Sequence, residues 1–163
     1  LFKKNQVTHL PGRGVLAGKG RVEYTPKDGG QKQTLAAKHV VLATGSRPKD
    51  LPFLRIDHER VWDSTDAMLA TEAPKTLAIV GAGAIGCEYA DVYAAFGTKV
   101  TIIEALDRLL PLEDKDCSAV VEKAYRKRGI EIYTAAKVQK ADIAADKVTL
   151  TGETAKGETK TIE

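Results

Sequence analysis

The stretch IVGAGAIGCEYA, residues 79–90, places three glycines at the spacing G-x-G-x-x-G directly after an apolar run. This spacing is typical of a strand that turns into a helix whose N-terminus holds the pyrophosphate of a dinucleotide, because unpaired N–H groups and the helix dipole favour an anion. Gly81 permits the tight turn, Gly83 lets the backbone approach the pyrophosphate, and Gly86 lets the helix pack closely on the strand. A glycine-rich turn that binds nothing is the structural alternative.

An acidic residue at the end of the next apolar run favours the dinucleotide interpretation. Glu104 follows KVTII (99–103) and lies 23 positions after Gly81, since 104 minus 81 is 23; the fingerprint expects roughly 20. A carboxylate there accepts hydrogen bonds from a ribose diol and repels a 2′-phosphate, which favours NAD over NADP. Arg108 points the other way, because a nearby arginine can hold a phosphate.

Glu88, two residues after Gly86, has two interpretations. It either stabilises the positive end of the helix dipole, by about 0.3–1 kcal/mol, or contacts the nicotinamide end of the cofactor. The residues alone favour the dipole interpretation.

Composition excludes several other classes of protein. Apolar residues make up 43% of the chain, enough for a core, and the net charge of +3 from 25 basic and 22 acidic residues is not the basic footprint of a nucleic-acid binder. No apolar run approaches the ~20 residues of a membrane span, and LFKKNQVTHL at the start lacks a signal-peptide pattern. Cys87 and Cys117 form no C-x-x-C, so we expect a reduced, cytoplasmic setting.

The first part of the chain, roughly residues 6–46, is expected to be β-structure. Asp28-Gly29-Gly30 predicts a hairpin turn, and the strand that returns from it ends in a continuous apolar run over 40–43, typical of a strand covered on both faces. Residues 47–74 then form a connection, in which Asp63-Ser64-Thr65 offers a helix start. We expect a β-rich domain over 1–73 and a second domain over 74–163.

The second domain alternates strand and helix. Apolar runs at 76–80 and 99–103 predict parallel strands, and further strands are expected over 130–143 and 147–153. Two helices are expected between and after the parallel strands. Their apolar residues at helical spacing are Ile85, Tyr89, Val92 and Phe96 in the first, and Val120, Val121 and Tyr125 in the second. The fold class is therefore α/β, a Rossmann-like dinucleotide-binding domain with a parallel sheet, preceded by a β-rich segment.

The remaining chemistry-bearing residues show no catalytic or metal-ligand spacing. Cys87 is expected to be a small buried residue and Cys117 a surface or half-buried thiol. The three histidines, which we expect to be structural, are His9, His39 and His58. We therefore predict no catalytic residue and no metal site in this chain.

Three stretches together resemble the pyridine nucleotide–disulfide oxidoreductases. HLPGRGVLAGKGRVEY (9–24) and KHVVLATGSRPKDLP (38–52) resemble the end of the flavin-domain segment of these enzymes. TLAIVGAGAIGCEYADVYAAFGTKVTIIEALDRLLP (76–111) resembles their NAD-binding domain. The paired motifs, Ala-Thr-Gly and then the glycine fingerprint, are more specific than either alone.

The resemblance implies a homodimeric flavoenzyme that uses FAD and NAD. Within the family it is nearest to the members that oxidise dihydrolipoamide as part of 2-oxoacid dehydrogenase complexes, which would be its partners; no nucleic acid or membrane is expected. It places Ala43-Thr44-Gly45 near FAD, the glycines on the NAD pyrophosphate, Glu104 on the adenosine ribose and Glu88 near the nicotinamide. The implied cofactor-binding residues are Ala43, Thr44, Gly45, Gly81, Gly83, Ala84, Ile85, Gly86, Glu88, Glu104 and Ala105.

The chain also departs from the family pattern. It has no pair of cysteines separated by four residues, no FAD-binding glycine fingerprint before residue 43 and no His–Glu acid/base pair. We therefore expect an internal fragment, ending before the last strand of the NAD domain and inactive alone. The alternatives are an NADH-dependent relative, such as an NADH oxidase or another disulfide reductase, and a non-catalytic nucleotide-binding module.

Overall fold

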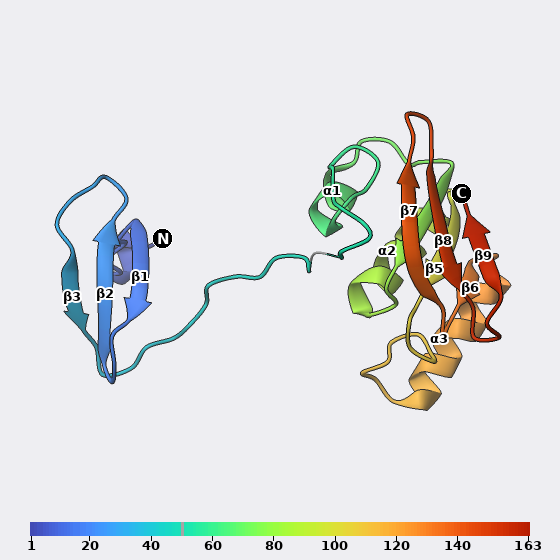
Figure 1. Cartoon of the computed structure of the whole chain (residues 1–163). Coiled ribbons are helices and arrows are strands. Elements are labelled where there is room, and N and C mark those ends of the chain that lie inside the picture. The colour runs from blue at the N-terminus through green and yellow to red at the C-terminus, as the bar shows by residue number, and fades with distance from the viewer. Residues whose placement is uncertain (50) are drawn as a thin grey trace. The chain divides into compact units, whose positions relative to one another are not determined.

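The computed structural model describes residues 1–49 and 51–163, and its ribbon is shown in Figure 1. The described chain forms two compact units, Leu1–Ser46 and Arg47–Glu163, each of which is described by itself. Asp50, within the predicted connection, lies outside the described residues.

The first unit is an antiparallel sheet of three strands, after a short 3-10 turn η1 (Lys3–Asn5). The strands, in spatial order, are β1 (Gly12–Leu16), β2 (Arg21–Pro26) and β3 (Gln33–Ala36). The hairpin predicted at Asp28-Gly29-Gly30 is confirmed: it joins β2 to β3, and Gly29 has a φ of 81°, a conformation that glycine adopts without strain.

The covered strand predicted over residues 40–43 is wrong. The chain is irregular from residue 37 to 49, and the Val41 side chain is 85% exposed. A strand needs at least one hydrogen-bonded neighbour, and the described residues contain no strand paired with this stretch. Apolar content alone therefore did not make a strand.

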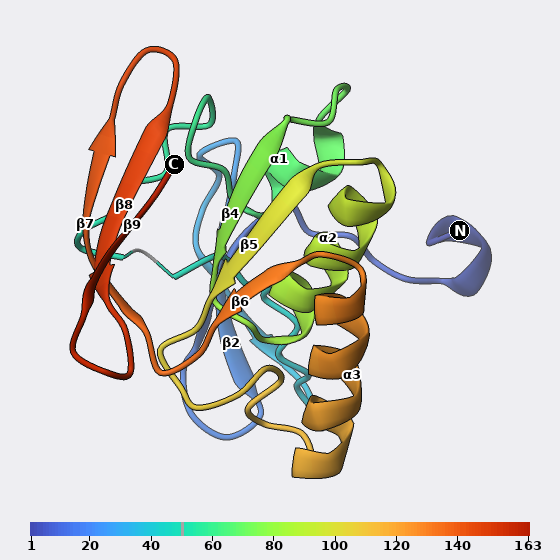
Figure 2. The same ribbon diagram turned by 90° about the vertical axis from the view of Figure 1, so that its right-hand side faces the viewer.

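The second unit is built on a parallel sheet with helical crossovers, as predicted. Its strands, in spatial order, are β4 (Thr76–Val80), β5 (Lys99–Ile103) and β6 (Glu131–Tyr133), and the crossover helices are α2 (Ala84–Ala95) and α3 (Lys115–Lys127). Both helices lie on one face of the sheet (Figure 2), where Val100 and Ile102 of β5 are buried in the core. The α/β fold class with a Rossmann-like parallel sheet is confirmed.

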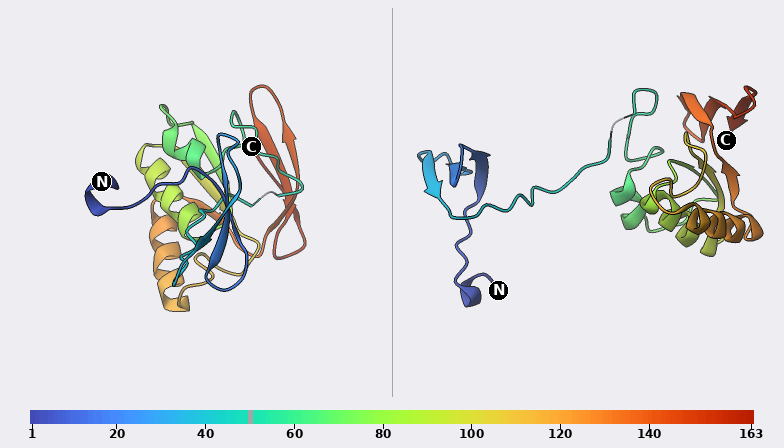
Figure 3. Two further views of the ribbon diagram at one scale, coloured as in Figure 1. Left: turned by 90° about the vertical axis from the view of Figure 1, so that its left-hand side faces the viewer. Right: turned by 90° about the horizontal axis from the view of Figure 1, so that it is seen from below.

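The other face of the parallel sheet is covered by an antiparallel sheet, which Figure 3 shows from two further sides. Its strands are β7 (Lys137–Ile143), β8 (Val148–Glu153) and β9 (Thr159–Ile162). A second core cluster lies between the sheets, formed by Ile103, Ala136 and Leu150. The strand β9 was not predicted, because four residues are too few for an alternation pattern to stand out.

Of the apolar stripe predicted for α2, Tyr89 packs against the core, but the other three residues do not lie on the buried face. Ile85 is 60% and Phe96 72% exposed, whereas Cys87, Ala90 and Tyr93 are buried. The helix approaches the sheet too closely for large side chains in its first turns, so small residues take the inner positions. On α3, Val120 is likewise exposed, and Val121 and Tyr125 pack against the core as expected.

The short helix α1 (Ser64–Leu69) packs within the second unit. Asp63 caps it through backbone N–H groups, which confirms the predicted helix start. The hydroxyl of Tyr89 donates to Ser64 O and that of Tyr93 to Ala67 O, both at 2.8 Å. These bonds tie α1 to α2, so the structure divides the chain at 46/47, earlier than the 73/74 boundary expected from the sequence. Within the described chain, the helices are all too short or too polar to span a bilayer.

Candidate dinucleotide-binding site

The turn between β4 and α2 carries the three glycines of the fingerprint. Gly81 has a φ of 109°, and its N–H donates to Ile103 O on β5 at 2.8 Å. A residue with a Cβ is strained at this φ, so the tight turn requires glycine here.

Gly86 and Gly83 are glycines for two different reasons. A Cβ at Gly86 would lie 2.1 Å from Gly81 O and 3.3 Å from the Ile79 side chain, so close packing of α2 on β4 requires glycine. A Cβ at Gly83 would meet nothing within 4 Å in the described chain, and the φ of −70° suits any residue. The fold therefore does not require glycine at position 83, and the open space fits the approach of a ligand backbone group.

The N-terminus of α2 is suited to an anion. Gly83 is the N-cap residue and has no side chain to accept a bond from the first-turn N–H groups, and that turn contains no acidic residue. Ala84 and Ile85 are exposed there. Backbone donors and the positive end of the helix dipole thus face an exposed position.

Glu104, at the end of β5, lies directly beside this turn. Its side chain is buried, with the residue 7% exposed. Oε2 accepts a hydrogen bond from Ala82 N at 2.6 Å and Oε1 accepts one from Leu106 N at 2.8 Å. Each carboxylate oxygen keeps a lone pair for a further donor, so the structure brings the two main predicted features together.

Arg108, the residue that argued for NADP, is held within its own loop. One guanidinium nitrogen donates to Pro111 O at 2.8 Å and another pairs with the Asp107 carboxylate at 3.0 Å. These bonds use two of the five guanidinium N–H donors and hold the side chain against its own loop, while the buried Nε has no partner among the described residues.

The position of Glu88 changes the balance between its two interpretations. It is exposed and is the fifth residue of α2, outside the first turn. The helix dipole acts mainly on charges within the first turn, so this position weakens the dipole interpretation. Ala105, after Glu104, is also exposed.

The predicted FAD-proximal residues Ala43, Thr44 and Gly45 lie in the first unit. All three are exposed in irregular chain, and Gly45 has a φ of 78°. Glycine adopts that φ without strain.

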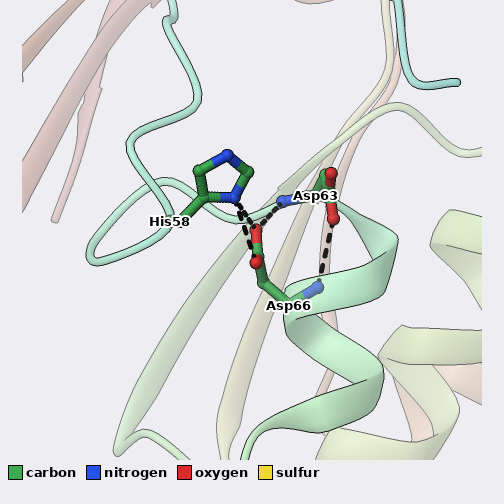
Figure 4. Close-up of side chains that lie close together, drawn as sticks. All are labelled: His58, Asp63 and Asp66. Carbon is green, nitrogen blue, oxygen red and sulfur yellow. Dashed lines mark hydrogen bonds and ion pairs between the residues drawn. The ribbon is translucent and has the colours of Figure 1, made fainter. Parts of the chain in front are cut away.

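His58 forms a polar cluster with Asp63 and Asp66, shown in Figure 4. His58 Nδ1 lies 2.9 Å from Asp66 Oδ2, and this bond raises the pKa of His58 above its usual value. The two aspartates form a reciprocal capping box at the start of α1, and the bond from the Asp63 N–H lowers the pKa of Asp66. This cluster was not predicted, although Asp63-x-x-Asp66 has the spacing of a capping box. The three groups serve the helix start, so His58 has a structural partner.

The two cysteines differ in their exposure to solvent. Cys87 is buried and its thiol donates weakly to Ala82 O at 3.4 Å; burial raises the pKa of this thiol. Cys117 is exposed in the first turn of α3. Neither carries the features of an activated nucleophile with a partner base.

Comparisons with known proteins agree with this geometry. The family model described as pyridine nucleotide-disulphide oxidoreductase matches residues 2–163. Dihydrolipoyl dehydrogenase 3 of Pseudomonas putida is 42% identical over 159 residues, which cover 98% of this chain and 34% of that protein. The crystal structure of LpdA from Mycobacterium tuberculosis superposes with a TM-score of 0.74 at 28% identity, over 95% of this chain and 34% of that one.

The water-forming NADH oxidase from Lactobacillus brevis, solved bound to NADH, gives a TM-score of 0.64 at 25% identity, over 93% of this chain and 34% of that one. The chain thus spans about a third of the length of the curated relatives that it matches. With a family model matched along nearly its whole length, the chain belongs to the pyridine nucleotide-disulphide oxidoreductase family.

Proposed function

We propose that this chain is the NAD-binding part of a flavoprotein that oxidises dihydrolipoamide with NAD. The observation that carries the proposal is the buried Glu104 carboxylate beside the glycine turn at the N-terminus of α2. A carboxylate at this place accepts from ribose hydroxyls and repels a 2′-phosphate. The similarity to dihydrolipoyl dehydrogenases supports the choice of substrate.

Each predicted residue then has a stated role. The N–H groups at Gly83 and in the first turn of α2, at Ala84 and Ile85, hold the pyrophosphate. Glu104 and the neighbouring Ala105 lie at the adenosine ribose. The glycines at 81 and 86 shape the turn.

Other residues lie toward the nicotinamide of NAD and toward the flavin. Glu88, on the exposed face of α2, lies toward the nicotinamide, and the Ala43-Thr44-Gly45 turn belongs to the flavin pocket. NAD and FAD, when bound, supply hydride transfer; the chain's own residues bind and orient the dinucleotide.

The proposal extends to the setting of the whole protein. We propose a homodimer that works with the components of a 2-oxoacid dehydrogenase complex in the cytoplasm. Two free cysteines, one buried and one exposed, support a reducing environment. A membrane or nucleic-acid partner has no support in the mixed surface charge.

Two alternative functions would use the same dinucleotide site but differ from the proposed function in substrate or in redox chemistry. An NADH oxidase or another disulfide reductase would share the NAD site but not the substrate, and the likeness to the Lactobacillus brevis enzyme is the observation that supports this alternative. A non-catalytic nucleotide-binding module would keep affinity for NADH without any redox partner.

The test is a calorimetric comparison of NADH and NADPH on the 163-residue chain. We expect NADH to bind at least tenfold more tightly, a difference of about 1.4 kcal/mol, because the Glu104 carboxylate repels the 2′-phosphate. Equal affinities would refute the NAD assignment and redirect attention to Arg108.

A further inference from the structure

Ala82, between the first two glycines, has both of its backbone groups held by the loop after β5. Its N–H donates to Glu104 Oε2 at 2.6 Å, and its carbonyl accepts from Leu110 N at 2.8 Å. The residue has no exposed surface. The conformation of the glycine turn is therefore held by hydrogen bonds to residues that lie more than twenty positions later in the chain.

The Glu104 carboxylate bridges two backbone N–H groups, and each oxygen keeps a lone pair for a ligand. While Oε2 holds Ala82, Oε1 accepts from Leu106 N at 2.8 Å. The backbone of Glu104 is itself anchored, because its N–H donates to Tyr133 O and its carbonyl accepts from Ala136 N, at 2.8 and 2.9 Å. Hydrogen bonds from backbone N–H groups to a carboxylate are among the strong ones in proteins.

We propose that Glu104 is also a positioning residue, which holds the pyrophosphate-binding turn in its working conformation before the dinucleotide arrives. This inference rests on the proposed function. Gly81 and Gly83 leave the backbone on either side of Ala82 with unusual freedom, and the bridge removes that freedom in advance. Ordering the turn before binding lowers the entropy that binding must overcome.

One consequence concerns cofactor choice. The same carboxylate sets the preference at the ribose and the shape of the turn at the pyrophosphate. A neutral replacement at position 104 therefore weakens every dinucleotide, including ligands without a 2′-substituent, instead of exchanging NAD for NADP.

The test compares Glu104→Gln with Glu113→Gln on the full 163-residue chain. Glu113 is exposed in the same connection, so its substitution makes the same change in charge away from the turn. The ligands are ADP and 2′,3′-dideoxy-ADP, which lacks the hydroxyls that a ribose contact needs. We expect Glu104→Gln to bind dideoxy-ADP at least tenfold more weakly than the unaltered chain, and Glu113→Gln to bind it within twofold.

A ribose contact alone would give a different pattern. Glu104→Gln would then lose affinity for ADP but keep the unaltered affinity for dideoxy-ADP, and this result overturns the positioning role while leaving the proposed function intact. Absence of NADH and ADP binding to the unaltered chain would instead refute the proposed function.

A second readout needs no ligand. Hydrogen exchange at the Ala82 amide, followed by NMR, should be at least tenfold faster in Glu104→Gln than in Glu113→Gln. If Glu104→Gln does not fold, Glu104→Asp takes its place, since its carboxylate is one methylene too short for the bridge. Unchanged exchange at Ala82 in the folded variant would overturn the proposal.

Discussion

Adding one methyl group to the glycine turn should have different effects at Gly86 and at Gly83. At Gly86 the new Cβ would lie 2.1 Å from Gly81 O, a backbone atom that cannot swing aside. Forcing extra atoms into a packed interior costs typically about 1–3 kcal/mol, and the better helix propensity of alanine returns at most about 1 kcal/mol. We expect Gly86→Ala to lower the free energy of unfolding by about 1–2 kcal/mol.

At Gly83 the same methyl group meets nothing within 4 Å of the described chain, and the backbone conformation suits alanine. Gly83→Ala should therefore cost only about 0.5 kcal/mol, since alanine is a poorer N-cap than glycine. It should lose NADH affinity, because the Cβ stands where the pyrophosphate approaches.

Thermal unfolding and NADH titration of both variants test whether Gly86 serves packing and Gly83 serves binding. A protein of this size loses about 2–4 °C per kcal/mol, so Gly86→Ala should melt about 2–8 °C lower and Gly83→Ala about 1–2 °C lower than the unaltered chain. If Gly83→Ala binds NADH normally, or if Gly86→Ala melts unchanged, the division of roles between the two glycines is wrong.

Three further results are expected. Because Asp66 raises the pKa of His58 above 6.5, the pair's contribution to stability is full below about pH 6.5 and is lost as the pH rises through the folded pKa. The variant His58→Asn, whose asparagine tolerates the φ of 63°, should therefore lose more stability relative to the unaltered chain at pH 5.5 than at pH 9. A pH-independent difference in stability would contradict the ion pair. A thiol reagent should label Cys117 within minutes and Cys87 only on unfolding, because one is exposed and the other buried with a raised pKa; equal rates would contradict that placement. The purified chain should be colourless and inactive with dihydrolipoamide and NAD, because one of its two free thiols is buried and the other exposed; a yellow, active preparation would overturn this expectation.

The parts of the site that could be predicted are those encoded locally. The three glycines meet three steric requirements within six residues, and two of these, the positive φ at Gly81 and the close approach at Gly86, are present in the structure. Glu104 could be placed beside the turn because parallel strands joined by a helix bring their carboxyl ends to one edge of the sheet.

The parts that could not be predicted depend on neighbours far away in sequence. The buried face of α2 is set by how closely the sheet approaches, so Cys87 and Ala90 lie inside and Phe96 outside. The stretch 40–43 has the composition of a covered strand, but a strand forms only where another lies beside it. The bond between His58 and Asp66 depends on how the chain between them turns, which no periodicity records.

The central claim is that NADH binds along the glycine turn and Glu104. The most direct measurement is an NMR titration of the labelled chain with NADH, following every assigned backbone amide. We predict that the largest shifts fall at residues 81–88 and 104–106, with smaller changes on β7, β8 and β9. Saturating NADH that leaves 81–88 unmoved, or that shifts resonances elsewhere instead, would contradict the account.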